Sequence, residues 1–221
     1  MFNDAVEAFR EVLTPPFRAI LLRSVAITIG LLIVLGIGLE ALLTWALDLP
    51  YPWLNVTASI LGGVGILIAL AFMVGPVTSL LAGFFADDAA EIVERTRFPQ
   101  DPPGVALPLG RSLVVTIRFA LVTLAGNIVA LALLLVPGVN IAAFFVVNGY
   151  LLGREYFEAA AMRFRPVEEA RAFRRRHGVA VFVAGLVVAV VLAIPFVNLV
   201  TPLFATAFMV RLHKRLSAAA G

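Results

Sequence analysis

The chain has 221 residues, of which 62% are hydrophobic and 14% are charged, and a formal net charge of +3. A soluble domain is typically about half apolar and a quarter charged, so this composition excludes an ordinary water-soluble fold and indicates an integral membrane protein. There is no cysteine, which excludes disulfides and thiol chemistry, and there are two histidines. We therefore expect no metal site and no cofactor.

Residues 1–14 carry a helical pattern with one apolar face, formed by Phe2, Val6, Phe9 and Val12/Leu13. The other faces carry the charged residues Asp4, Glu7, Arg10 and Glu11. The pattern predicts a short amphipathic helix that ends before the prolines at 15 and 16. Such a helix can lie in the membrane interface or pack on a cytoplasmic loop, and both interpretations remain open.

Two long apolar stretches follow, residues 24–47 and 54–86, and Glu40 is the one acidic or basic residue within them. About 20 residues at ~1.5 Å each cross a ~30 Å hydrocarbon core, so both stretches are predicted to span the membrane. Glu40 is either an interfacial residue or a functional one. The turn between the stretches has the aromatic cluster typical of a membrane–water boundary: Trp45, Tyr51 and Trp53.

The second half of the chain contains an internal repeat. Residues 134–141, Leu-Leu-Val-Pro-Gly-Val-Asn-Ile, recur at 192–199 as Leu-Ala-Ile-Pro-Phe-Val-Asn-Leu. Each copy lies inside a long uncharged stretch, the first at 119–153 and the second at 179–210. Repeats of this kind indicate duplicated structural units.

Each repeat divides its stretch into segments shorter than the about 20 residues that a crossing helix needs. The connecting residues are also less polar than a loop in water. We therefore expect two helical hairpins that enter the membrane partway and turn at Pro137, Gly138 and Pro195. Two alternatives remain: one kinked spanning helix in each stretch, or a pair of complete short spans.

All 17 lysine and arginine residues lie in segments 1–23, 87–118, 154–178 and 211–221. If two spans cross and both hairpins return, every basic segment and both termini are cytoplasmic, as the positive-inside rule requires. Kinked single spans would place 154–178 outside, whereas the rule does not separate hairpins from complete pairs.

The predicted fold is thus an all-α integral membrane protein with one membrane domain, residues 1–221. It has two transmembrane helices, two proline-tipped hairpins and amphipathic cytoplasmic helices at 87–96 and 154–177. We expect it to contact the lipid bilayer and to form a homo-oligomer, because two full crossings are too few to enclose a pore.

Polar side chains that could meet a solute are few. Asn140 and Asn198 follow the hairpin tips, where they can cap the returning helices or, with the positive ends of those helices, meet an anion. Arg18 and Arg23 lie at the mouth of the first span, where they either reach lipid head groups or bind a tetrahedral oxyanion. No catalytic motif is present, so we expect neither an enzyme nor a nucleic-acid binder.

Four segments, in this order, resemble the CysZ-type sulfate permeases, a group related to the etoposide-induced membrane proteins. They are Val12-Leu-Thr-Pro-Pro-Phe-Arg18, Gly75-Pro76-Val-Thr-Ser-Leu-Leu81-Ala, Pro137-Gly-Val-Asn140 and Pro195-Phe-Val-Asn-Leu-Val-Thr-Pro202. The similarity extends over roughly residues 5–215. In the family, a Gly-hydrophobic-Arg-Arg element at the first span is associated with sulfate. The matching stretch here is Pro16-Phe17-Arg18-Ala19, which lacks the glycine and the second arginine.

The resemblance implies two long helices with two partly penetrating hairpins, an oligomeric channel-like assembly, and sulfate uptake across the bacterial inner membrane for cysteine biosynthesis. The binding residues expected on this basis are Arg18, Arg23, Asn140 and Asn198. A membrane scaffold that binds a partner protein through its cytoplasmic helices, and a transporter of another solute, are the alternatives.

Overall fold

The structure is a computed structural model that describes residues 1–46, 51–134 and 140–219. This part of the chain is helical, with no strand among the described residues. Its elements are α1 (Phe2–Val12), α2 (Pro15–Ala46), α3 (Pro52–Phe84), α4 (Ala86–Arg97), α5 (Leu109–Leu134), α6 (Asn140–Met162), α7 (Val167–Arg176), α8 (Gly178–Ala193), the 3-10 helix η1 (Val197–Val200) and α9 (Thr201–Ala218).

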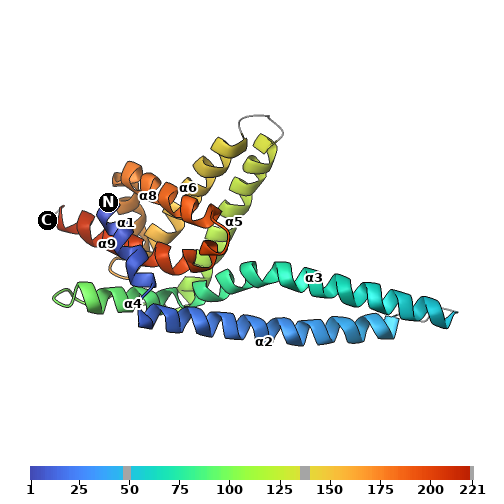
Figure 1. The fold of residues 1–221 in the computed structure, drawn as a ribbon. Helices are drawn as coiled ribbons and strands as arrows, with labels where there is room; N and C mark the ends of the chain where they lie inside the picture. The colour runs from blue at the N-terminus through green and yellow to red at the C-terminus, as the bar shows by residue number, and fades with distance from the viewer. Residues whose placement is uncertain (47–50, 135–139, 220–221) are drawn as a thin grey trace.

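Helices α2 and α3 form an antiparallel pair, here called the arm, that projects from the rest of the molecule (Figure 1). Among the described residues, α2 and the part of α3 up to Val74 are the helices long and apolar enough to cross a membrane. Their side chains are apolar on all sides and largely exposed, as expected for helices that face lipid. Glycines bring the two helices together, because a Cβ at Gly36 would press on Leu70 and one at Gly62 would press on Leu43.

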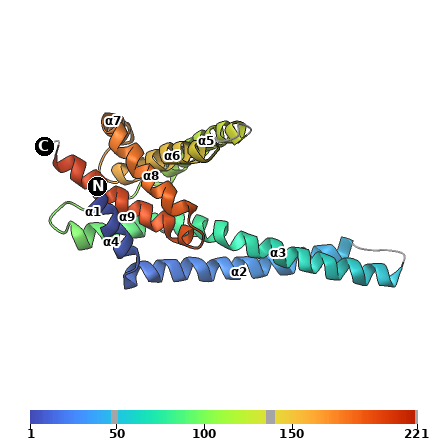
Figure 2. The same cartoon turned by 45° about the horizontal axis from the view of Figure 1, so that its top comes forward.

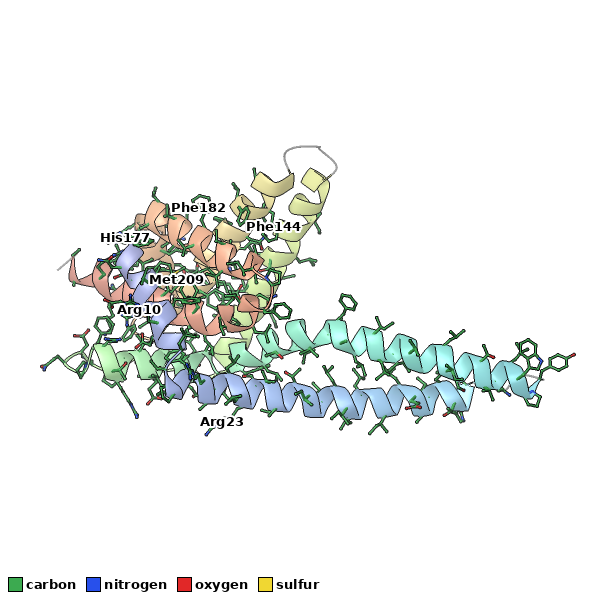
Figure 3. The ribbon with its side chains drawn as sticks, viewed as in Figure 1. Arg10, Arg23, Phe144, His177, Phe182 and Met209 are labelled. Atoms are coloured by element: carbon green, nitrogen blue, oxygen red, sulfur yellow. The ribbon has the colours of Figure 1, made fainter. Side chains whose placement is uncertain are left out.

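The remaining helices, apart from the projecting end of the α5–α6 hairpin, form a compact bundle, here called the body. Its central element is α9, whose residues from Thr201 through His213 are all buried. Helices α1, α4, α6 and α8 pack around it (Figure 2), and Met209 lies among their side chains (Figure 3). A helix covered on every side can be apolar on every side, which explains the unbroken uncharged run that ends at Val210.

Helix α1 buries a face that only partly overlaps the apolar face of its pattern, because Val12 is buried as well. The residues buried against the body include Ala5, Ala8 and Glu11, whereas Phe2 is 80% exposed and Phe9 is 38% exposed. The small alanines allow close approach to α9, and Phe9 packs edge-on against Phe204 of α9 with ring centroids 6.1 Å apart. Phe2 is left outside. Helix α1 therefore packs on protein, while its insertion into the interface stays a prediction.

The two predicted hairpins correspond to α5–α6 and to α8–η1–α9, but α5, α6 and α9 are longer than the uncharged segments that predicted them, whereas α8 is not. Helix α5 has 26 residues and α6 has 23, because α6 continues through charged residues to Met162. Helix length alone therefore does not decide how deep the first hairpin goes, and partial penetration stays a prediction. The tip residues Pro137 and Gly138 lie outside the described residues.

The second hairpin turns at Pro195 and Phe196. Phe196 has φ of 65°, a left-handed conformation unusual for a residue with a side chain, and it is 89% exposed. In the repeat, Gly138 occupies the same position as Phe196. Positive φ favours glycine. The two repeat copies therefore agree in spacing, but the second copy has phenylalanine at the position where glycine would be favoured.

Asn198 does not cap the returning helix, contrary to the sequence-based prediction. It lies within η1, and α9 begins three residues later, with Val200 as its N-cap and no side-chain cap bond. The cap assignment failed because the turn contains an extra 3-10 segment that the sequence did not indicate. Asn140 is the first residue of α6, but its side chain is outside the described part.

Helices α6 and α8 cross at a point where glycine is required. A Cβ at Gly185 would collide with the carbonyl oxygen of Gly149 and would lie 2.7 Å from Cα of Gly153. These are backbone atoms, which cannot rotate away as a side chain can.

We expect Gly185→Ala to lower the free energy of unfolding by about 1–3 kcal/mol, the usual cost of overpacking. The matched control is Gly30→Ala in α2, where a Cβ has nothing within 4 Å; it should leave stability unchanged or raise it slightly, because alanine favours helix. The check is the apparent melting temperature of purified protein in detergent. Equal melting temperatures for the two variants would contradict the close crossing.

Candidate functional site

The two arginines predicted to capture an anion, Arg18 and Arg23, are both exposed on α2. Neither has an ion-pair partner among the described residues. Arg23 points away from the body (Figure 3). Five residues at about 100° each place the two side chains some 140° apart around the helix. They therefore form two separate positive positions at the start of the arm, and they do not bind one anion together.

The second predicted element is the tip of the α8–α9 hairpin. The Asn198 side-chain oxygen is buried there without a hydrogen-bond partner in the described part of the chain, and so is the Thr201 hydroxyl. Thr201 is 2% exposed and is the first residue of α9. Buried polar atoms are normally paired, and the start of a helix carries partial positive charge. The Thr201 hydroxyl is therefore an unused donor at a point that favours an anion, whereas the Asn198 oxygen can only accept a hydrogen bond.

No described contact joins the arm arginines to the hairpin tip. The tip packs against α3 instead, because η1 contacts that helix. The two helices of the arm are linked by a buried hydrogen bond. The Thr78 hydroxyl of α3 donates to the Thr28 hydroxyl of α2 over 3.1 Å. The predicted residues thus lie on neighbouring elements and do not share one pocket.

Most of the charge inside the body is paired, and the sequence did not reveal these pairs. Arg211 of α9 donates to Glu11 over 2.7 Å and to Glu7 over 2.7 Å, both on α1. Arg163 at the end of α6 donates to Glu94 over 2.7 Å and to Asp87 over 2.5 Å, both on α4. Burial opposes the charged form of Arg163, but these two carboxylates outweigh it and raise its pKa.

Arg211 and Glu11 are 200 positions apart, so no spacing rule could have connected them. The available sequence signals were an acid in a short amphipathic helix and an arginine directly after an apolar run. With their donors used by carboxylates, Arg163 and Arg211 are committed to holding the body together and are poor candidates for a mobile anion.

A third cluster surrounds Glu158, which is 1% exposed. Arg174 donates to its carboxylate over 2.6 Å, and the Nε atoms of Arg154 and Arg171 lie 3.5 and 3.8 Å from it. Arg171 also donates to the exposed Glu168 over 2.6 Å. The structure therefore buries this acid among three arginines.

The body also contains a cavity of about 260 Å³ between α4, α5, α6 and α9. Its charged lining consists of Asp87, Glu155 and Arg163. Burial raises the pKa of Glu155, and the neighbouring Arg154 partly offsets this effect. Two acids and one already paired arginine make this cavity unsuited to an oxyanion. Within the described residues, no group of three acidic or histidine side chains is arranged to hold a metal ion.

Comparison with known proteins identifies a family. A family model described as Sulfate transporter CysZ/Etoposide-induced protein 2.4 matches residues 4–202, which include the arm, the α5–α6 hairpin and the tip of the α8–α9 hairpin. No curated protein matches the chain.

The Glu158 cluster predicts a large difference between two acids that share Arg171. Glu158→Gln leaves three arginines without their buried counter-charge, and we expect it to lower the free energy of unfolding by about 3–5 kcal/mol. Glu168→Gln removes an exposed partner and should change stability little. Thermal unfolding of both variants in the same detergent measures the difference. A Glu158→Gln variant as stable as Glu168→Gln would refute the buried cluster.

Proposed function

This chain belongs to the Sulfate transporter CysZ/Etoposide-induced protein 2.4 family, and on that premise we propose that it conducts an inorganic oxyanion across the membrane. We propose sulfate as the physiological solute, taken up for sulfur assimilation and cysteine biosynthesis. The family is a transporter family, and no enzymatic step is needed for this role.

One observation carries the proposal: the exposed arginines at the start of the arm are unpaired in the described structure, whereas the interior arginines are paired. Arg163 and Arg211 each have two carboxylate partners. Arg18 and Arg23 have none among the described residues and are exposed, so their guanidinium groups are free to attract an oxyanion. Capture at two separate positions gives weak binding, which suits conduction because the ion must also leave.

Deeper binding is assigned in this proposal to the tip of the α8–α9 hairpin. The unpaired Thr201 hydroxyl can donate a hydrogen bond to an anion beside the positive end of α9. The Asn198 side chain takes part in this proposal only if its amide nitrogen faces the anion, because its oxygen can only accept a hydrogen bond. The repeat extends the same role to Asn140 at the start of α6. Half-helix ends that point at anionic solutes are a recurring device in transporters.

We propose that the pathway forms in a homo-oligomer in the bacterial inner membrane, with both termini in the cytoplasm. Two spanning helices cannot surround a pore, so several copies of the arm are required. The packing of α1 against α9 supports placing the two termini on one side (Figure 1). The alternative of a partner-binding scaffold gains no support from α4, because its apolar residues Ala89, Ala90 and Val93 are already buried in the body.

The test is uptake of radiolabelled sulfate into proteoliposomes that contain the purified protein. We expect uptake above that of empty vesicles, and an initial rate about three- to tenfold lower for Arg18→Ala because one charged contact is lost. Arg10→Ala is the matched control, since Arg10 is also exposed and has no ion-pair partner in the described structure. It should transport normally.

Thr201→Val keeps the volume of the side chain and removes the hydroxyl, so it should reduce the rate without reducing stability. Absence of uptake by the wild-type protein would overturn the transport function. Uptake that is unchanged in both Arg18→Ala and Thr201→Val would keep transport but remove these residues from its path. If phosphate or an uncharged solute competes more strongly than selenate, the physiological solute is not sulfate.

A further inference from the structure

Helix α7 ends in a run of arginines that divide into two kinds. Arg171 and Arg174 lie beside the buried Glu158 of α6, and Arg174 donates to its carboxylate over 2.6 Å. Arg175 and Arg176 are exposed and have no ion-pair partner among the described residues. The first two arginines therefore attach α7 to the body, whereas the last two leave an uncompensated positive charge on its surface.

The chain bends directly after these arginines. Helices α7 and α8 are joined at His177, which Figure 3 labels, and the bend between them is 91°. Val179 is the second residue of α8 and follows Arg176 by three positions, a length of chain that spans at most about 11 Å. Chain connectivity alone therefore keeps the unpaired arginines next to the beginning of α8 (Figure 2).

Helix α8 has one apolar face on protein and another that is exposed. Its Gly185 side is packed against Gly149 of α6. On the other side Val179, Val183 and Val190 are each at least 40% exposed. At ~100° per residue these three valines lie within about 40° of one another around the helix, so they form a single stripe.

The length of the valine stripe matches one leaflet of a bilayer. From Val179 to Val190 the helix rises about 17 Å at ~1.5 Å per residue, close to half of a ~30 Å hydrocarbon core. If α8 stands along the bilayer normal, the 91° bend places α7 parallel to the membrane surface. Arg175 and Arg176 are then at the level of the lipid phosphates, directly above the stripe.

Two unpaired guanidinium groups select a lipid with a net negative charge. A guanidinium binds phosphate oxygens with two parallel hydrogen bonds. In phosphatidylcholine the phosphate is followed by a cation, which these arginines repel, whereas phosphatidylglycerol has none. The exposed acids of α7, Glu168 and Glu169, lie about two turns before the arginines, and Glu168 is paired with Arg171. A free phosphate ion would use the arginines alone and leave the valine stripe uncovered.

We propose that the α7–α8 bend is a binding site for an anionic phospholipid. The lipid phosphate pairs with Arg175 and Arg176, and one acyl chain lies along the stripe of Val179, Val183 and Val190. Charge and apolar surface meet at one point of the chain, and a phospholipid has the same two parts in the same order. The inference requires α8 to lie in the bilayer and does not depend on transport.

The experiment places a single cysteine at Val183 in the full-length chain, which has no other, and labels it with bimane. The protein is reconstituted in phosphatidylcholine bilayers that contain phosphatidylglycerol or phosphatidylcholine with a nitroxide on one acyl chain. Nitroxides quench bimane at short range, so quenching reports which lipid lies on the stripe. We expect phosphatidylglycerol to associate about three- to tenfold more strongly than phosphatidylcholine. The double substitution Arg175→Gln/Arg176→Gln should abolish this preference and retain quenching by both lipids.

Arg10→Gln/Arg95→Gln is the matched control, because it also removes two exposed arginines but takes them from α1 and α4. It should leave the preference at Val183→Cys unchanged. A second control is bimane at Leu61→Cys, which is 68% exposed on α3 and should report no preference between the lipids.

Four results would overturn the proposal. Equal association of the two lipids at Val183→Cys, or a preference that survives Arg175→Gln/Arg176→Gln, would remove the arginines from lipid binding. Absence of quenching by either lipid would show that protein or water covers the stripe. A preference abolished by added inorganic phosphate would assign the arginines to a free anion.

Discussion

The rest of the structure depends on the ion pair between Arg211 and Glu11. Both side chains are buried, and removing one partner of such a pair typically costs about 3–5 kcal/mol, so α1 is firmly held against α9. Arg163 holds α4 to the end of α6 in the same way, and Arg97 links α4 to Glu11 at 3.3 Å. Because α1 leads directly into α2 and α3 leads directly into α4, these pairs also fix both helices of the arm relative to the body.

This arrangement divides the arginines by role. Those inside the body neutralise buried carboxylates and are needed for folding. Those at the start of the arm pair with no carboxylate in the described structure. Glu40, in the outer half of the arm, is likewise an acid with no ion-pair partner among the described residues. In a chain with so few charges in its apolar segments, an unpaired charge is a better indication of a ligand than a charge that belongs to a buried pair.

The sequence predicted the elements of the fold better than their contacts. The two long helices of the arm follow from uninterrupted apolar runs, and the repeat indicated two helical pairs, because both are local features. The apolar face of α1 is only partly buried, since Val12 packs inward with the small residues and Glu11 while Phe2 stays outside. The capping role predicted for Asn198 was wrong, and the partners of Arg211 and Arg163 could not be predicted, because pairing across the chain depends on the assembled body.

We propose that the arm crosses the bilayer while the α8–α9 hairpin ends within it. The chain has no cysteine, so single cysteines can report accessibility without background. Tyr51→Cys lies at the tip of the arm and Phe196→Cys at the tip of the hairpin, and both side chains are exposed, at 59% and 89%. An impermeant thiol reagent added outside intact cells should label Tyr51→Cys and leave Phe196→Cys unlabelled. Equal labelling of the two positions from outside would contradict the claim and show that the hairpin crosses completely.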